Sequence, residues 1–266
     1  MIIQPEQPSE HYLAISQPAH SWVSGQLARA WGNEVFSGFQ PFEQMCYAAE
    51  QHDVGFLQWE RAPTLNQATG LPHTFEDLPE QVHFEIWRTG ILQLRAVCPY
   101  ASLVVSMHFC NLSERIHSRL ANRDQAESRA FLTEQRKYQQ VIRSSLEGDP
   151  LLNEALESDV LAYHRNLIAT WDLLSLELCR SRSDHFSVPN APIWKKEHAG
   201  IRVRKVDCVA NVWEVDPWPF KVRSVTAVSE ARRIRGRFDN LDTMRVTLED
   251  AERISIQFRL KSCEGL

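Results

Sequence analysis

Apolar residues recur at helical spacing along the first two-thirds of the chain. In the segment that begins at Pro41, the side chains of Phe42, Met45, Cys46 and Ala49 fall on one stripe, as they do on a helix with one buried face. Proline suits the first turn of a helix, and glycine or asparagine suits the residue that ends it. These signals predict a short strand at residues 12–16 and helices at residues 18–31, 41–53, 80–97, 101–120, 123–146 and 153–180.

The apolar pattern changes to a period of two after residue 187. Ile254, Ile256, Phe258 and Leu260 alternate with polar residues, which is typical of a strand with one buried face. We expect further strands at residues 201–206 and 209–215, and a hairpin that joins residues 246–248 to this last strand. The predicted fold class is mainly α, with a helical domain at residues 1–186 and a smaller β-rich C-terminal region at residues 187–266.

The segment between the second and third predicted helices differs from its surroundings. Residues 61–80 are rich in proline, glycine and asparagine, so they predict a long loop. A loop of this length within a domain is often functional, for example as a lid over a site.

The composition argues against several classes of protein. With 43% hydrophobic and 24% charged residues, the chain is typical of a folded domain and not of a disordered one. A net charge of −5 gives no general attraction to nucleic acid or to an anionic membrane. The six cysteines form no CxxC pair, and the first residues lack the pattern of a secretory signal. We therefore expect a cytoplasmic protein with reduced thiols, no membrane-spanning segment and no nucleic-acid partner.

The adjacent pair His52-Asp53, at the end of a predicted helix, is the first candidate for chemistry. A neutral imidazole and a carboxylate are good ligands for iron, manganese or zinc. Adjacent ligands at a helix end can converge on one ion, because the backbone leaves helical geometry there. The alternative for this pair alone is a helix-terminal histidine beside a solvated aspartate.

Asp172 lies in a predicted helix that is otherwise rich in leucine. It shares a face with Ile168 and Leu176, so a buried position is expected. A buried carboxylate needs a partner. A metal ion would supply one. The alternatives are a salt bridge to an arginine such as Arg165, or an exposed aspartate on the polar edge of the helix.

Three further histidines lie on predicted helices. His20 falls in the first turn of its helix, His83 shares a face with Trp87, and His108 shares a face with Leu112. A single histidine on an apolar face is usually a hydrogen-bonded core residue, but several that face inward on separate helices favour a common site. The predicted metal ligands are therefore His20, His52, Asp53, His83, His108 and Asp172.

The order of these residues resembles the HD-domain superfamily of metal-dependent phosphohydrolases. There a histidine precedes a His-Asp pair, and a distant aspartate lies on a later helix; the matching positions are His20, His52-Asp53 and Asp172. Members with two metals add two histidines, which His83 and His108 match in order. The stretches at residues 17–20, 52–56 and 106–108 also resemble an uncharacterised bacterial family with the same arrangement.

The resemblance implies an HD-type helical domain that holds two divalent metal ions bridged by Asp53. Iron or manganese is favoured, and zinc, cobalt or nickel are alternatives. It further implies hydrolysis of a small phosphorylated substrate, with nucleotides as candidates. The chain departs from the superfamily where Val54-Gly55-Phe56 follows the pair in place of a charged residue. The phosphate-binding residues are therefore open, with Arg61, Arg88 and Arg165 as candidates.

Two other functions are compatible with the same residues. Some proteins that resemble this ligand set hold two irons and oxygenate their substrates. A third hypothesis is a sensory or binding module, in which the C-terminal β-rich region contacts a partner and the metal site is structural.

Overall fold

Residues 1–6, 10–119 and 126–263 are described in the computed structural model, apart from the side chains of residues 117–119. The helices of this part of the chain are α1 (Gln17–Ala30), α2 (Phe42–Gln51), α3 (Phe56–Glu60), α4 (Glu80–Val97), α5 (Pro99–Arg119), α6 (Ala126–Leu146), α7 (Ser158–Arg180) and α8 (Leu241–Asp250). The predicted starts and ends of most long helices are confirmed to within a few residues. The predicted end of one helix at residue 120 and the predicted start of the next at residue 123 lie outside the described residues.

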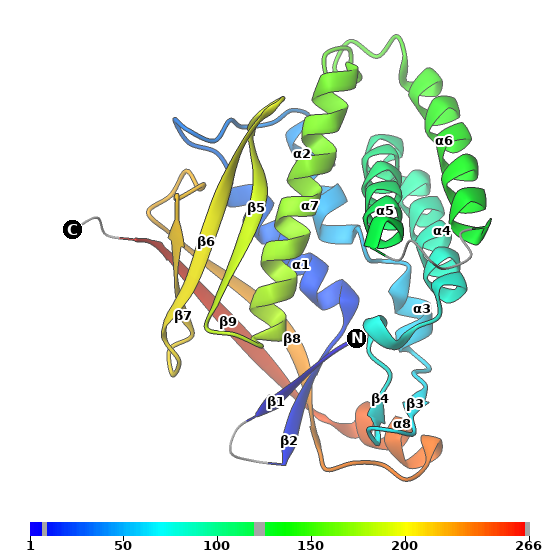
Figure 1. Ribbon diagram of the computed structural model, residues 1–266, viewed down its shortest axis with the longest axis vertical. Coiled ribbons are helices and arrows are strands. Elements are labelled where there is room, and N and C mark those ends of the chain that lie inside the picture. Colours follow the sequence, from blue (N-terminus) through cyan, green and yellow to red (C-terminus); the bar gives the residue numbers. More distant parts are fainter. Residues whose placement is uncertain (7–9, 120–125, 264–266) are drawn as a thin grey trace.

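A seven-stranded mixed sheet accompanies the helices and is built from both ends of the chain (Figure 1). Its strands are β1 (Ile2–Glu6), β2 (His11–Ile15), β5 (His185–Trp194), β6 (Glu197–Asp207), β7 (Val212–Asp216), β8 (Ser224–Arg235) and β9 (Glu252–Ser262). Their order is β1-β2-β8-β9-β7-β6-β5, and only β7 and β9 pair in parallel. The N-terminal hairpin β1–β2 therefore extends the sheet that the C-terminal strands begin.

The long helices lie in layers on one side of this sheet. Helices α1 and α7 pack against it, α1 on β8 and α7 on β1 and β5. Helices α2 and α5 pack next, and α4 and α6 lie outside α5 (Figure 1). One hydrophobic cluster joins the layers, with members as distant in sequence as Ile15, Trp171 and Phe258. The division at residue 187 stays a prediction.

The predicted fold class is wrong, as is its description as all-α, because the sheet is too large and includes the N-terminus. Strand β8 was missed because the buried positions in its middle are small or polar: Ala227, Ser229 and Ala231 alternate with more exposed residues, and larger buried apolar residues stand only near its ends, at Val225 and Ile234. Strand β5 was missed because its prolines indicated a linker. The strand accommodates them at the sheet edge, with register shifts between Val188 and Ala191 and between Pro192 and Trp194, where proline is tolerated.

The predicted hairpin at residues 246–248 is also wrong, because these residues belong to α8. The side chain of Asn240 caps this helix by accepting a hydrogen bond from the backbone N–H of Thr243 at 2.9 Å. Met244 and Leu248, four residues apart, are both buried, so the apolar spacing fits a helical face better than a strand.

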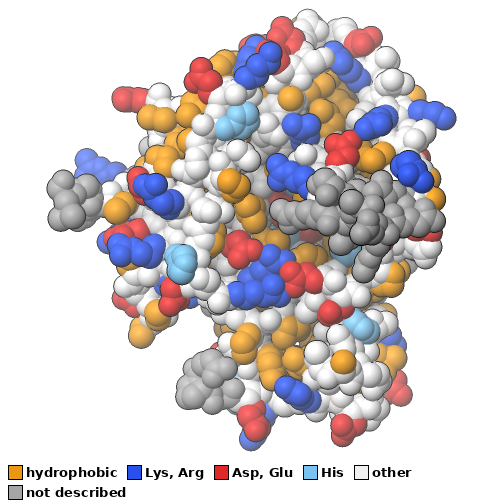
Figure 2. Space-filling model, in the orientation of Figure 1, with side chains coloured by type: hydrophobic (Ala, Val, Ile, Leu, Met, Phe, Trp, Pro, Cys, Tyr) orange, Lys and Arg blue, Asp and Glu red, His pale blue; other side chains and the backbone are white. Residues whose placement is uncertain are grey.

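The predicted loop at residues 61–80 contains a small hairpin, β3 (Leu65–Asn66) and β4 (Leu71–Pro72), and a 3-10 turn at Phe75–Asp77. None of the helices in the described ranges is both long enough and apolar enough to cross a membrane. On the face drawn in Figure 2, Lys and Arg side chains are interspersed with Asp and Glu.

Candidate metal centre

The first turn of α1 is fixed at its N-terminus by two acceptors. The hydroxyl of Ser16 accepts a hydrogen bond from the backbone N–H of Ala19 at 3.0 Å, which is a helix N-cap. The carboxylate of the buried Glu60 accepts from the backbone N–H of Gln17, at 3.1 Å for each oxygen. Because these contacts orient the first turn, they also set the direction of His20.

Small residues let α1 approach its neighbours closely. A Cβ added to Gly25 would lie 2.6 Å from Cβ of Glu50 on α2. On the other side, the hydroxyl of Ser24 lies 2.7 Å from that of Ser175 on α7. The imidazole of His20 thereby reaches side chains on both neighbouring elements.

His52 and Asp53 lie directly after α2, where the chain turns towards α3. His52 is the C-cap residue of α2, and its Nδ1–H donates to the carbonyl of Ala49 at 2.9 Å. Gly55 follows, and a Cβ there would lie 2.1 Å from the carbonyl oxygen of Ile86 on α4. Close contact with α4 therefore holds the turn that carries the His-Asp pair.

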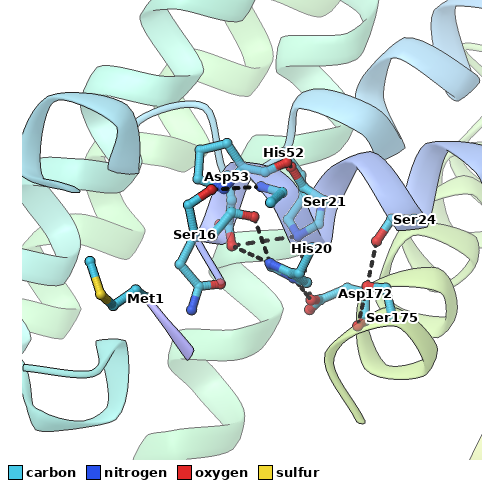
Figure 3. A network of polar contacts seen from close by, with 12 residues as sticks. Met1, Ser16, His20, Ser21, Ser24, His52, Asp53, Asp172 and Ser175 are labelled. Atoms are coloured by element: carbon cyan, nitrogen blue, oxygen red, sulfur yellow. Dashed lines mark hydrogen bonds and ion pairs between the residues drawn. The ribbon is translucent and has the colours of Figure 1, made fainter. Parts of the chain in front are cut away.

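Asp172, on α7, is the point at which three histidines meet. Its Oδ1 lies 3.2 Å from Nε2 of His20 and 3.4 Å from Nε2 of His52, and its Oδ2 lies 3.3 Å from Nε2 of His108 on α5. Figure 3 shows the side chains of His20, His52, Asp53 and Asp172 pointing towards one another. The alternative pairing with Arg165 does not form, since that guanidinium donates to Asn166.

Asp53 completes the group from the other side. Its Oδ2 lies 3.7 Å from Nδ1 of His20 and 3.7 Å from Nε2 of His52. Ligand atoms of His20, His52 and Asp53 all lie within 4.8 Å of one another. All three residues are buried, the histidines at 1% exposure and Asp53 at 8%. This buried group could bind a metal ion.

The hydrogen bonds of the imidazoles support that fit. A backbone carbonyl can only accept, so His20 and His52 each donate Nδ1–H, to Gln17 and Ala49, and His83 donates Nε2–H to Phe75. When such a ring is neutral, as it must be to bind a metal, its other nitrogen carries a lone pair. A histidine that binds a metal commonly donates its second ring N–H in this way.

Several buried ring nitrogens of the site have no hydrogen-bond partner. They are Nε2 of His52, Nδ1 of His83 and both ring nitrogens of His108, one of which carries a lone pair when that ring is neutral. Nε2 of His52 and Nε2 of His108 nevertheless lie 3.4 Å and 3.3 Å from the carboxylate of Asp172. Nε2 of His20 faces the carboxylate of Asp172, which is repulsive for a neutral ring unless a cation or a proton lies between them. Unpartnered buried nitrogens are costly, and a metal ion would satisfy them.

The site strongly shifts the pKa values of its own groups. Burial lowers the pKa of His52, but the carboxylates of Asp53 and Asp172 outweigh it and raise the pKa to about 9. Burial raises the pKa of Asp172, but the imidazoles of His108, His20 and His52 outweigh it and hold that pKa well below its usual value. Burial lowers the pKa of His83. The site therefore keeps the carboxylate of Asp172 charged.

All six predicted ligands line one cavity of about 470 Å³. His83 stands apart within this cavity, because its Nε2 donates to the carbonyl of Phe75 at 2.6 Å and not to a carboxylate. The cavity lining does not include the candidate phosphate-binding residues Arg61, Arg88 and Arg165. Arg88, for example, pairs with Glu134 at 2.9 Å.

Gln17 is a cavity residue that the sequence analysis did not identify as functional. Its side chain is buried, lines the cavity, and its Nε2 has no hydrogen-bond partner. A glutamine at a helix start is ordinary in sequence, so the only signal is three-dimensional: a buried amide donor beside the carboxylates and imidazoles.

No curated protein and no solved structure matches this chain in the comparisons with known proteins. The resemblance to the HD-domain superfamily stays a prediction, whereas the resemblance to an uncharacterised family is supported by a family match. Residues 1–236 match the family described as "Protein of unknown function (DUF3891)". Because that match covers most of the 266 residues, the chain belongs to this family.

Proposed function

We propose that the protein is a metal-dependent hydrolase of phosphoesters. The observation that carries the proposal is the convergence of His20, His52, Asp53, His108 and Asp172 on one buried point that opens into a cavity. Imidazole and carboxylate ligands together suit iron, manganese or zinc. His20, His52, Asp53 and Asp172 would hold one ion, and His83 and His108 would share Asp53 with a second.

A bound ion would lower the pKa of a coordinated water and neutralise phosphate charge. The residues of the chain contribute the rest. The carbonyls of Gln17, Ala49 and Phe75 orient the imidazoles of His20, His52 and His83 and select the ring nitrogen that faces the cavity. Asp172, which lies 3.2 Å from Nε2 of His20 and 3.4 Å from Nε2 of His52, would share the ion with those two rings. The amide of Gln17 can donate a hydrogen bond to a substrate oxygen, since its Nε2 is unpartnered.

The test is hydrolysis by the full chain loaded separately with iron, manganese, zinc, cobalt or nickel. A panel of phosphomonoesters, phosphodiesters and nucleotides is incubated with each form, and released phosphate or alcohol is measured. We expect turnover with at least one metal and loss of that turnover in the Asp172→Asn variant. A protein that binds metal and cleaves no phosphoester would contradict the proposal.

A second candidate is an iron-dependent oxygenase. It uses the same ligand set, and the cavity walls are largely apolar, which suits a substrate that is oxidised at carbon. Oxygen consumption by the iron-loaded protein in the presence of a candidate substrate distinguishes it from the hydrolase. A protein that isolates with zinc alone would count against it.

A further inference from the structure

The cavity is lined by several large apolar side chains, six of which we call the apolar wall: Phe56, Phe84, Trp87, Phe109, Leu112 and Leu176. They come from four helices, α3, α4, α5 and α7. The indole of Trp87 stacks on the ring of Phe109 with centroids 4.7 Å apart, and Phe84 stacks on Phe131 at 4.5 Å. These stacks make the wall a preformed surface, which is the usual character of a small-molecule site.

The polar side chains of the lining outside the six predicted ligands are few. They are Gln17, Glu76, Glu80 and Ser113. The hydroxyl of Ser113 is hydrogen-bonded to Ser128, and Glu76 pairs with Arg180 and Arg182. Among these four lining residues, Gln17 has a buried donor without a hydrogen-bond partner, its amide Nε2.

The described lining residues include no lysine or arginine. The guanidiniums of Arg180 and Arg182 are both paired with Glu76, a lining residue, at 2.5 Å. A chain of two or three phosphates needs cations beyond the one or two at the catalytic end. A nucleobase and a ribose also need several fixed donors and acceptors to be recognised, because buried polar groups require partners.

We propose that the substrate is a monoester with a single phosphate and a bulky aromatic or branched aliphatic body. The proposal rests on the hydrolase function above and replaces the nucleotide that the sequence resemblance implies. The apolar wall would bury the body, and the Gln17 amide would donate to a phosphate oxygen. In the reaction, the oxygen of water bonds to phosphorus and the ester P–O bond breaks. The leaving oxygen takes a proton, so the products are an alcohol and inorganic phosphate.

Binding of phosphonates, which have no ester bond to hydrolyse, tests the recognition separately from catalysis. Calorimetric titration of the metal-loaded full chain uses methylphosphonate, phenylphosphonate, naphthylmethylphosphonate and the methylenephosphonate analogue of adenosine monophosphate. Because burial of apolar area drives binding, we expect the naphthyl compound to bind about tenfold or more tightly than the methyl compound. It should also bind more tightly than the adenosine analogue.

Variants of the wall and of Gln17 should separate the two ends of the ligand. Leu176→Asn should weaken the naphthyl compound and spare the methyl compound, with Leu112→Asn as a second wall variant if the first does not fold. Leu92→Asn, at an exposed position of α4, is the matched control and should change neither. Gln17→Met should weaken all the phosphonates alike, by about tenfold, because a hydrogen bond to a charged group is lost.

Equal affinities along the series, or tightest binding of the adenosine analogue, would overturn the proposed substrate class. If phosphoesters are nevertheless cleaved, the proposed hydrolase function stands and only the proposed substrate class is overturned. Graded binding with no ester cleaved by any metal form would instead contradict the hydrolase function, and would leave the recognition of an apolar phosphonate supported.

Discussion

Asp53 and Asp172 both lie close to the imidazoles of His20 and His52. Their roles in metal binding should therefore differ from that of His83. Asp53 lies 3.7 Å from two imidazoles, whereas His83 lines the cavity without a carboxylate contact in the described network. Replacing a residue that contacts both ions removes one ligand from each ion, whereas replacing a residue that contacts one ion removes a ligand from that ion alone. The loss of bound metal should therefore be greater at a bridging position.

We expect Asp53→Ala to remove bound metal more completely than His83→Ala does. Elemental analysis of both variants, after identical purification, measures the difference. His198→Ala, at an exposed position of β6, should retain the metal content of the unchanged protein. Equal metal loss in the Asp53 and His83 variants would contradict the bridging role of Asp53.

The titration of His52 gives a second prediction at this scale. In the metal-free protein its pKa is about 9, above the ordinary value of 6.5. A raised pKa means that the protonated ring stabilises the fold. This contribution is complete below about pH 6.5 and is lost as the pH rises through about 9. Metal competes with the proton for the same ring, so metal affinity should increase over that window.

Thermal unfolding of chelator-treated protein across this pH window measures the contribution of His52. The melting temperature of the unchanged chain should fall as pH rises, and the fall should be smaller in His52→Gln, which has no proton to lose. Chelator-treated protein whose melting temperature does not fall over the window would count against the contribution assigned to protonated His52.

The buried group of His20, His52 and Asp53 could be anticipated from sequence, because each is a ligand-type residue at or near a predicted helix and their order resembles a known pattern. The assignment of all six residues as ligands stays a prediction. Gln17 could not be found in this way. Its significance comes from an amide nitrogen left without a partner, which depends on how α1, α3 and α7 pack and has no pattern in the chain.

At the scale of elements, the crossing of α3 and α4 holds the His-Asp turn in place. The backbone of Gly55 lies against that of Ile86 and Gly90, and an added Cβ would lie 2.1 Å from the carbonyl oxygen of Ile86. A backbone atom cannot move aside as a flexible side chain does, so α4 would have to shift away from the site.

Gly55→Ala should therefore destabilise the protein by about 1–3 kcal/mol, the usual cost of overpacking, and should weaken metal binding. Gly38→Ala is the matched control, because a Cβ there meets nothing within 4 Å. Urea unfolding of both variants measures the free energies. A Gly55 variant as stable as the control would show that the crossing does not constrain the site.

Long helices were predictable because their apolar stripes extend over several turns, whereas α8 and β8 were not. In α8, the pair Val246 and Leu248 suggested a strand, although Asn240 and the spacing of Met244 and Leu248 specify a capped helix. In β8, the alternation is present, but the buried residues in the middle of the strand are alanine and serine. Packing against α1 stabilises this segment as a strand, and the local hydrophobicity of the sequence does not indicate it.

At the scale of the whole molecule, the sheet and the metal-site helices share one core. Strand β2 pairs with β8 along residues 11–15, and the side chain of Gln26 on α1 both donates to and accepts from the backbone of Val228 on β8. The C-terminal strands therefore support the helix that carries His20. The pairing of chain ends could not be predicted, because no local pattern specifies which distant strand a short strand will join.

A chain truncated after Arg182 should fail to fold, because it loses β5–β9 and exposes the faces of α1 and α7 that pack on them. Circular dichroism and thermal unfolding of the truncated protein, beside the full chain, make the measurement. Cooperative unfolding and retained metal in the truncated form would show instead that residues 1–186 and 187–266 are separate domains, as the sequence predicts.

The metal content of the purified full chain tests the central claim most directly. The protein should be purified without a metal-affinity tag and analysed by inductively coupled plasma mass spectrometry, before and after loading with iron, manganese, zinc, cobalt or nickel. The site built from His20, His52, Asp53, His108 and Asp172 predicts at least one tightly held ion per chain. A protein that carries no metal on isolation and takes up none on loading would contradict the account.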